Sequence, residues 1–100
     1  MNAVPLDSSQ WHDVIVGGQT VRQIVANVES QNNAWYPAVL DATLPGEALL
    51  ELGCGTGVFS GILAKNGRRT TLLDFSPKSV EFCREVFDQA HLPGDFVQAD

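Results

Sequence analysis

A short apolar run followed at once by three alternating glycines constrains this sequence more than any other feature. The run is ALLEL, residues 48–52, and the stretch ELGCGTG places the glycines at Gly53, Gly55 and Gly57. Apolar residues at helical spacing follow over 57–66. A buried strand that turns into a helix through glycines is typical of the first turn of an α/β sheet, where backbone without side chains can approach a ligand.

The segments after this turn repeat the alternation of strand and helix. TTLLD (70–74) predicts a second strand, and a helix with Ser76 as its N-cap and Pro77 in its first turn follows. DFVQAD (95–100) then alternates as a third strand. Two strand–helix–strand units with short connections predict parallel strands and the start of a doubly wound α/β sheet.

The N-terminal part has a different pattern. Residues 1–18 are interpreted as a loose arm because they contain a proline, DSS and GG, with Trp11 and VIV (14–16) as a candidate hydrophobic anchor. A helix is predicted over 20–30, where Thr20 starts a capping box, and a second over 34–43, with Asn33 as its candidate N-cap. The chain is therefore divided into an N-terminal arm and helical cap, residues 1–44, and a strand–helix domain, residues 45–100.

Charge and composition exclude several classes of protein. The formal net charge is −6, which argues against a protein that grips nucleic-acid phosphates. The longest apolar run is too short for a membrane-spanning helix. The two cysteines show no metal-ligand spacing, and a single disulfide is unusual without a secretory signal, so a reduced, cytoplasmic protein with no metal is expected.

Acidic residues stand at the ends of the later predicted strands. Asp74 lies about 20 residues after the first glycine, where an acid in this architecture accepts hydrogen bonds from two ribose hydroxyls. Phe75 can lie against a flat base, and Asp100 can reach the exocyclic amine of adenine. The alternatives are a helix-capping role for Asp74 and ordinary loop chemistry for Asp100. The pattern favours a ligand that contains adenosine.

The glycine spacing indicates which ligand of this kind fits. A dinucleotide fold needs G-x-G-x-x-G, but Val58 stands where the third glycine would fall. Glu51, two residues before the first glycine, would repel a pyrophosphate and attract a cation. A sulfonium or an ammonium group therefore suits this loop better than a dinucleotide.

ELGCGTG, LLDFSPKSVEFCRE and DFVQAD together resemble the class I S-adenosylmethionine-dependent methyltransferases, over residues 45–100. The resemblance implies a Rossmann-like parallel sheet with helices on both faces, of which only the first three of seven strands are present. It implies S-adenosylmethionine as cofactor, and a cap in which Trp35 or Tyr36 closes over it. The implied cofactor-binding residues are Glu51, Gly53, Cys54, Gly55, Gly57, Asp74, Phe75 and Asp100.

The same resemblance implies transfer of a methyl group, by in-line attack, to a small-molecule or other non-nucleic-acid acceptor. The catalytic residues are unknown: His12 and His91 are interpreted as solvated or capping residues, Cys54 as a small loop residue and Cys83 as a core residue. Two alternatives remain open. One is a non-catalytic S-adenosylmethionine-binding module, and the other is an NAD-dependent oxidoreductase.

The predicted strand over 48–52 also bears on how the sheet is completed. Its residues are apolar on both faces, as in a central strand, yet it would lie at one edge of a three-stranded sheet. The expectation is therefore that a C-terminal half or a second chain completes the sheet.

Overall fold

The computed structural model describes residues 5–99, in which helices and strands follow the order α1, α2, α3, β1, α4, β2, α5, β3. The helices are α1 (Ser8–Val16), α2 (Val21–Glu29), α3 (Tyr36–Ala42), α4 (Val58–Lys65) and α5 (Pro77–Gln89). The strands are β1 (Ala48–Leu52), β2 (Arg69–Asp74) and β3 (Asp95–Gln98). No helix in residues 5–99 is long and apolar enough to cross a membrane.

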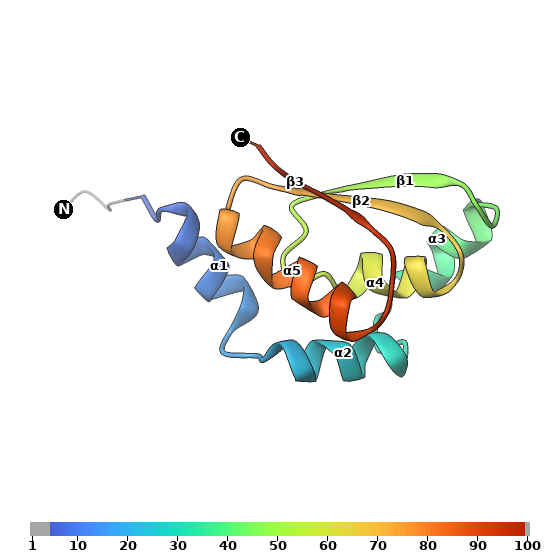
Figure 1. Ribbon diagram of the computed structural model, residues 1–100, viewed down its shortest axis with the longest axis horizontal. Coiled ribbons are helices and arrows are strands. Elements are labelled where there is room, and N and C mark those ends of the chain that lie inside the picture. The colour runs from blue at the N-terminus through green and yellow to red at the C-terminus, as the bar shows by residue number, and fades with distance from the viewer. Residues whose placement is uncertain (1–4, 100) are drawn as a thin grey trace.

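The three strands form one parallel sheet in the order β1-β2-β3. Leu52 of β1 is in register with Leu73 of β2, and Leu73 with Val97 of β3. The connections from β1 to β2 and from β2 to β3 run in the same direction across the sheet. Because such connections between parallel strands are right-handed, α4 and α5 lie on the same face. Figure 1 shows the sheet above this helical layer. The Rossmann-like α/β class predicted from the sequence is confirmed.

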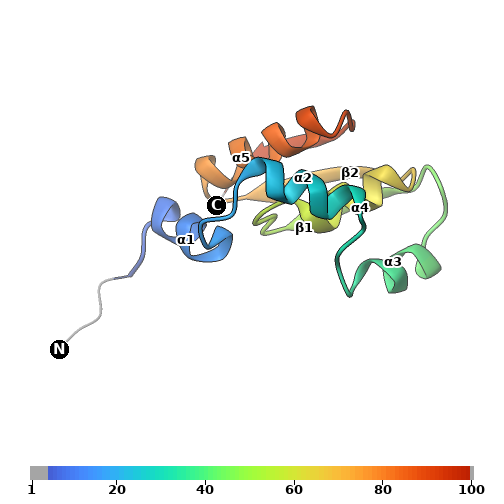
Figure 2. The same ribbon diagram turned by 90° about the horizontal axis from the view of Figure 1, so that it is seen from below.

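The core lies between the sheet and the helices. Leu72 of β2 is fully buried, together with Ile62 of α4 and Phe87 of α5. Helix α2 packs against α4 and α5 on the side away from the sheet, which Figure 2 shows from below. Its Val28 is buried and adds to the core. A Cβ on Gly61 would lie 2.8 Å from Val28 Cγ2, so the glycine allows α2 to approach α4 closely.

The opposite face of the sheet differs from the expectation of helices on both faces. Within residues 5–99 the connecting helices cover one face, and apolar side chains of the other face are exposed. Leu50 is 58% exposed, Leu52 is 71% exposed and Val97 is 41% exposed. We call these three residues the open face; they give the described sheet one unpartnered apolar side.

Helix α1 corrects the prediction of a loose arm over residues 1–18, of which residues 1–4 lie outside the described part. Asp7 and Gln10 form a capping box at its start, and Gly17, in the left-handed conformation, ends it. His12 and Val16, one helical turn apart, are buried. The loop interpretation was wrong because it weighed the proline and glycines of this segment above its capping signal.

The next two helices agree more closely with the sequence analysis. Thr20 caps α2 through the predicted capping box with Gln23. Helix α3 begins at Tyr36, two residues later than predicted, and Asn33 Oδ1 accepts hydrogen bonds from the backbone N–H groups of Trp35 and Tyr36. The asparagine therefore supports the turn that enters α3.

Candidate functional site

The glycine loop, residues 53–57, connects the carboxyl end of β1 to α4. Gly53, Gly55 and Gly57 all have positive φ, at 73°, 55° and 83°. The N–H of Gly53 donates to the carbonyl of Leu73 at 2.8 Å, which holds the loop against β2. A Cβ on Gly57 would lie 3.0 Å from Cys83 Sγ, so a side chain there would crowd α5. Backbone conformation and packing therefore both favour glycine in this loop, as the sequence predicts.

Asp74 lies against this loop, as the sequence spacing predicts. It is only 5% exposed, and its Oδ2 accepts the N–H of Gly55 at 3.4 Å. Its Oδ1 accepts the N–H of Ser76 at 2.9 Å, while Ser76 itself caps α5. Oδ1 therefore supports the start of α5, which is the helix-capping role considered as an alternative for Asp74, and Oδ2 faces the glycine loop. Oδ1 keeps a lone pair for a further donor such as a hydroxyl, whereas Oδ2 accepts from both Gly55 and Cys54.

Glu51 reaches the same region from the helix-facing side of β1. Ser60 Oγ of α4 donates to Glu51 Oε1 at 2.7 Å. Burial raises the pKa of Glu51, and the negative charge of Asp74 acts in the same direction, while the Ser60 hydrogen bond opposes both. Glu51 also lines a mainly apolar pocket of about 320 Å³ between β1, α4 and α3. The carboxylates of Glu51 and Asp74 therefore lie close enough for their charges to interact.

Two of the remaining predicted cofactor-binding residues, Cys54 and Phe75, lie beside Asp74. Cys54 is buried, and its thiol donates to Asp74 Oδ2 at 3.8 Å. Phe75 is 42% exposed, and its carbonyl accepts a hydrogen bond from Gln98 Nε2 at 2.9 Å, which ties the end of β3 to this edge. Asp100 lies outside the described residues, so its predicted contact with adenine stays a prediction.

Helix α1 is the part of this region that the sequence analysis missed. Its Ile15 side chain would lie 3.2 Å from a Cβ on Gly55, so α1 packs beside the glycine loop. His12 Nδ1 and Ser79 Oγ of α5 share a 2.7 Å hydrogen bond, and Lys78 Nζ lies 2.7 Å from Asp13 Oδ1. The capping box at Asp7 and the four-residue spacing of His12 and Val16 are the sequence signals for this helix.

His12 is buried, which corrects its interpretation as a solvated or capping residue. Its ring also packs edge-on against Phe82, with centroids 5.4 Å apart. Burial lowers the pKa of His12 and the charge of Lys78 lowers it further, while the charges of Asp13 and Asp74 oppose the shift. We therefore interpret His12 as a residue that anchors α1 to α5.

The structure does not bring Trp35 or Tyr36 to the glycine loop. Helix α3 lies at the amino ends of the strands, at the other end of the molecule from α1 (Figures 1 and 2). The guanidinium of Arg68, at the amino end of β2, donates to the carbonyls of Leu40 and Thr43 at 3.1 Å and 2.7 Å and holds α3 there. Trp35 is 74% exposed at this distant position. Of the described helices before β1, α1 is the one whose side chain lies beside the loop.

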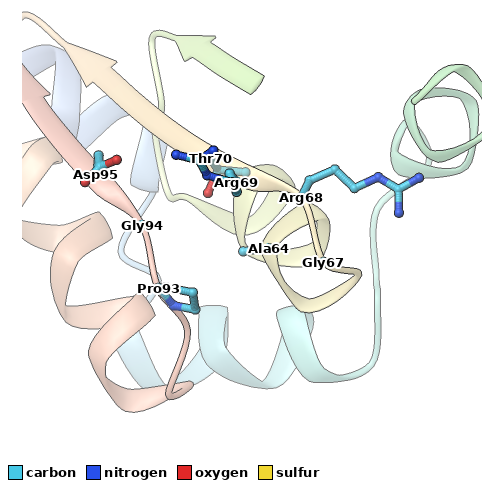
Figure 3. A pocket seen from close by; sticks show the side chains of 8 residues that line it. All are labelled: Ala64, Gly67, Arg68, Arg69, Thr70, Pro93, Gly94 and Asp95. Atoms are coloured by element: carbon cyan, nitrogen blue, oxygen red, sulfur yellow. The ribbon is translucent and has the colours of Figure 1, made fainter. Parts of the chain in front are cut away.

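A second pocket lies at the amino edge of the sheet. It has a volume of about 300 Å³, and Figure 3 shows Thr70 and Arg69 of β2 and Asp95 of β3 among its lining residues. None of the predicted cofactor-binding residues lines it. Among residues 5–99, no three His, Cys, Asp or Glu side chains form a group that could hold a metal ion. The described chain therefore gathers its candidate binding residues at the carboxyl edge.

Comparison with known families identifies this arrangement. The methyltransferase domain family matches residues 49–100, which is more than half of the chain and includes the glycine loop and Asp74. The chain belongs to this family. The match begins within β1, so the helices α1 to α3 precede the shared part of the methyltransferase domain.

Curated relatives are methyltransferases. The malonyl-[acyl-carrier protein] O-methyltransferase of Serratia marcescens is 44% identical over 55 residues, 54% of this chain and 22% of that protein. The ubiquinone biosynthesis O-methyltransferase of Methylobacterium sp. (strain 4-46) is 38% identical, over 53% of this chain and 21% of its own. The ribosomal RNA small subunit methyltransferase C of Pseudomonas aeruginosa (strain UCBPP-PA14) is 39% identical, over 57% of this chain and 18% of that protein. The chain spans about a fifth of the length of these relatives.

Solved structures show the same fold. One, from work on the conversion of a disulfide bond into a thioacetal group during echinomycin biosynthesis, has a TM-score of 0.59 and 38% identity, over 65% of this chain and 28% of that one. The PH0226 protein of Pyrococcus horikoshii OT3 has a TM-score of 0.63 and 19% identity, over 90% of this chain and 39% of its own. The likeness to PH0226 covers 90% of this chain, so it extends beyond residues 49–100, which the family model matches.

Proposed function

We propose that this chain binds S-adenosylmethionine and is the cofactor-binding part of an S-adenosylmethionine-dependent methyltransferase. The observation that carries the proposal is the 3.4 Å contact between the Asp74 carboxylate and the Gly55 N–H. It joins an acid at the end of β2 to a glycine loop at the end of β1, on the edge where open α/β sheets bind ligands. Membership of the methyltransferase domain family supports the same function.

The residues present fit this cofactor. Gly53 is exposed, and a Cβ there would meet nothing within 4 Å, so a ligand can lie against the backbone of the loop. Asp74 would accept hydrogen bonds from the ribose hydroxyls, and Phe75 would lie against the adenine. Glu51 would face the positively charged methionine part. When bound, S-adenosylmethionine supplies a methyl group on a positively charged sulfur, which a nucleophilic acceptor can attack in line.

We propose a small-molecule or other non-nucleic-acid acceptor. The net charge of −6 is unfavourable for binding a phosphate backbone. Two of the curated relatives are O-methyltransferases, one for malonyl-[acyl-carrier protein] and one in ubiquinone biosynthesis. We assign no catalytic base, because His12 is buried and hydrogen-bonded to Ser79. The chain's own residues bind and orient the cofactor in this proposal.

Isothermal titration calorimetry of the 100-residue chain with S-adenosylmethionine tests the proposal. We expect saturable binding and no binding of NAD under the same conditions, because Glu51 repels a pyrophosphate and Val58 replaces the third glycine of a dinucleotide loop. Binding of NAD without binding of S-adenosylmethionine would contradict the proposal and favour an oxidoreductase. A methyl-transfer assay then separates an enzyme from a non-catalytic cofactor-binding module.

A further inference from the structure

Two free thiols from distant parts of the sequence meet beneath the glycine loop. Cys54 lies in the loop and Cys83 lies on α5, and both are buried. Their sulfur atoms are 3.3 Å apart, with the thiol of Cys83 donating to Cys54 Sγ. The family resemblance assigns Cys54 only a place in the cofactor loop and assigns Cys83 nothing. A pair of thiols in contact can be oxidised to a disulfide without a large movement of either segment.

The two sulfurs are not equivalent. The hydrogen bond to Cys54 and, after it, burial raise the pKa of Cys83, so this residue remains a protonated thiol. Cys54 keeps 4% exposure and Cys83 keeps none, so an oxidant from solvent reaches Cys54 first and Cys83 is placed to react second. Gly53, the neighbour of Cys54, is exposed and has open space beside it, which gives a small oxidant a path to the loop.

We propose that Cys54 and Cys83 form a reversible disulfide when hydrogen peroxide oxidises the protein, and that this bond weakens binding of S-adenosylmethionine. In the first step the Cys54 sulfur attacks peroxide, the O–O bond breaks, and Cys54 becomes a sulfenic acid with release of water. In the second step the Cys83 sulfur displaces the hydroxyl from Cys54, which forms the S–S bond and releases a second water. The peroxide is reduced by two electrons, and a thiol reductant returns both cysteines.

The effect on cofactor binding follows from what Cys54 contacts; this half of the inference rests on the proposed function. A disulfide needs a sulfur separation of about 2.05 Å, so the loop must move toward α5 by on the order of 1 Å. Cys54 donates to Asp74 Oδ2, and the next residue, Gly55, donates to the same oxygen. Moving Cys54 therefore displaces the glycine loop relative to the carboxylate proposed to hold the ribose.

Mass spectrometry of the intact 100-residue chain tests the bond itself. After brief treatment with peroxide and removal of the excess, we expect the monomer mass to fall by about 2 Da, the mass of the two thiol hydrogens lost. Peptide mapping should show Cys54 linked to Cys83, and a thiol reductant should restore both thiols. Two free thiols after treatment, a disulfide between two chains, or a mass increase from sulfinic acid on Cys54 would each overturn the proposal.

Calorimetry on the same samples tests the consequence. We expect the oxidised chain to bind S-adenosylmethionine several-fold more weakly than the reduced chain, with full recovery after reduction. Cys83→Ser is the matched control because it keeps a small polar group on α5 but cannot form the disulfide. Peroxide should not lower the mass of this variant by about 2 Da, and it should not cause a loss of affinity that a thiol reductant reverses. If Cys83→Ser does not fold, Cys83→Ala serves the same purpose, because it also removes the second sulfur from α5 and leaves the glycine loop unchanged. Equal affinity of the two redox forms overturns the effect on binding, whereas failure of both forms to bind contradicts the proposed function and leaves the mass result to decide the disulfide.

Discussion

Asp74 is the single residue on which the proposed cofactor site depends most. Replacing it by Asn keeps the side-chain volume but removes the negative charge and one acceptor. We expect Asp74→Asn to weaken S-adenosylmethionine binding by about 1 to 3 kcal/mol, because hydrogen bonds from the ribose hydroxyls to a charged acceptor are lost. Calorimetry provides the measurement. Asp88→Asn, at an exposed position near the end of α5, is the control and should leave the affinity unchanged. Unchanged affinity in Asp74→Asn would remove this residue from the site.

Glu51 makes the binding of a positively charged ligand depend on pH. Because burial raises its pKa above the ordinary value of 4.5, Glu51 takes up a proton at a higher pH than an exposed glutamate as the pH falls. Protonation removes the negative charge of the carboxylate. As the pH falls, the affinity for S-adenosylmethionine should therefore begin to decline while the pH is still above 4.5. Titrations at a series of pH values measure this decline. Glu51→Gln should bind more weakly and lose most of the decline, whereas Glu81→Gln, on the exposed side of α5, should retain it.

At the scale of secondary structure, His12 connects α1 to α5 and makes stability depend on pH. Its pKa lies below 6.5 in the folded chain, so the unfolded chain binds more protons once the pH falls below 6.5. The free energy of unfolding should therefore decrease as the pH falls from 6.5 toward the lowered value, and level off below it. Urea unfolding at several pH values measures the slope. His12→Gln should reduce that slope, while Val14→Gln, on the exposed side of α1, should leave it unchanged.

The same helix shows where prediction from sequence succeeds in this chain and where it fails. The bounds of β1 and the caps at Thr20 and Ser76 were predictable because local residues determine them. The juxtaposition of Gly55 and Asp74 was also predictable, since parallel strands bring their carboxyl ends to one edge. The burial of His12 was not, because its partner Ser79 is 67 residues away and nothing local indicates that α1 packs there. The contact between Cys54 and Cys83 was missed for the same reason: each was interpreted from its own segment.

At the scale of the whole molecule, the open face and the edge of β1 determine how the described sheet meets its surroundings. Leu50, Leu52 and Val97 project from the side that α4 and α5 do not cover, and β1 has a hydrogen-bonded neighbour on only one side among residues 5–99. An exposed apolar sheet face beside an unpaired strand favours association with another chain or segment. We propose that further sequence or a second chain covers this face in the functional protein.

The isolated 100-residue chain should therefore self-associate, and its open face should be responsible. Analytical ultracentrifugation should show species larger than a monomer at micromolar concentration. The double variant Leu50→Lys, Leu52→Lys places two positive charges on this face, so we expect it to shift the distribution toward monomer without unfolding the helical layer, as circular dichroism can verify. Val14→Lys, an equally exposed apolar position on α1 away from the sheet, is the control and should not change the distribution. A wild-type chain that remains monomeric would contradict this prediction. A double variant that associates as the wild type does would also contradict it, because two charges on the open face oppose its burial against any partner.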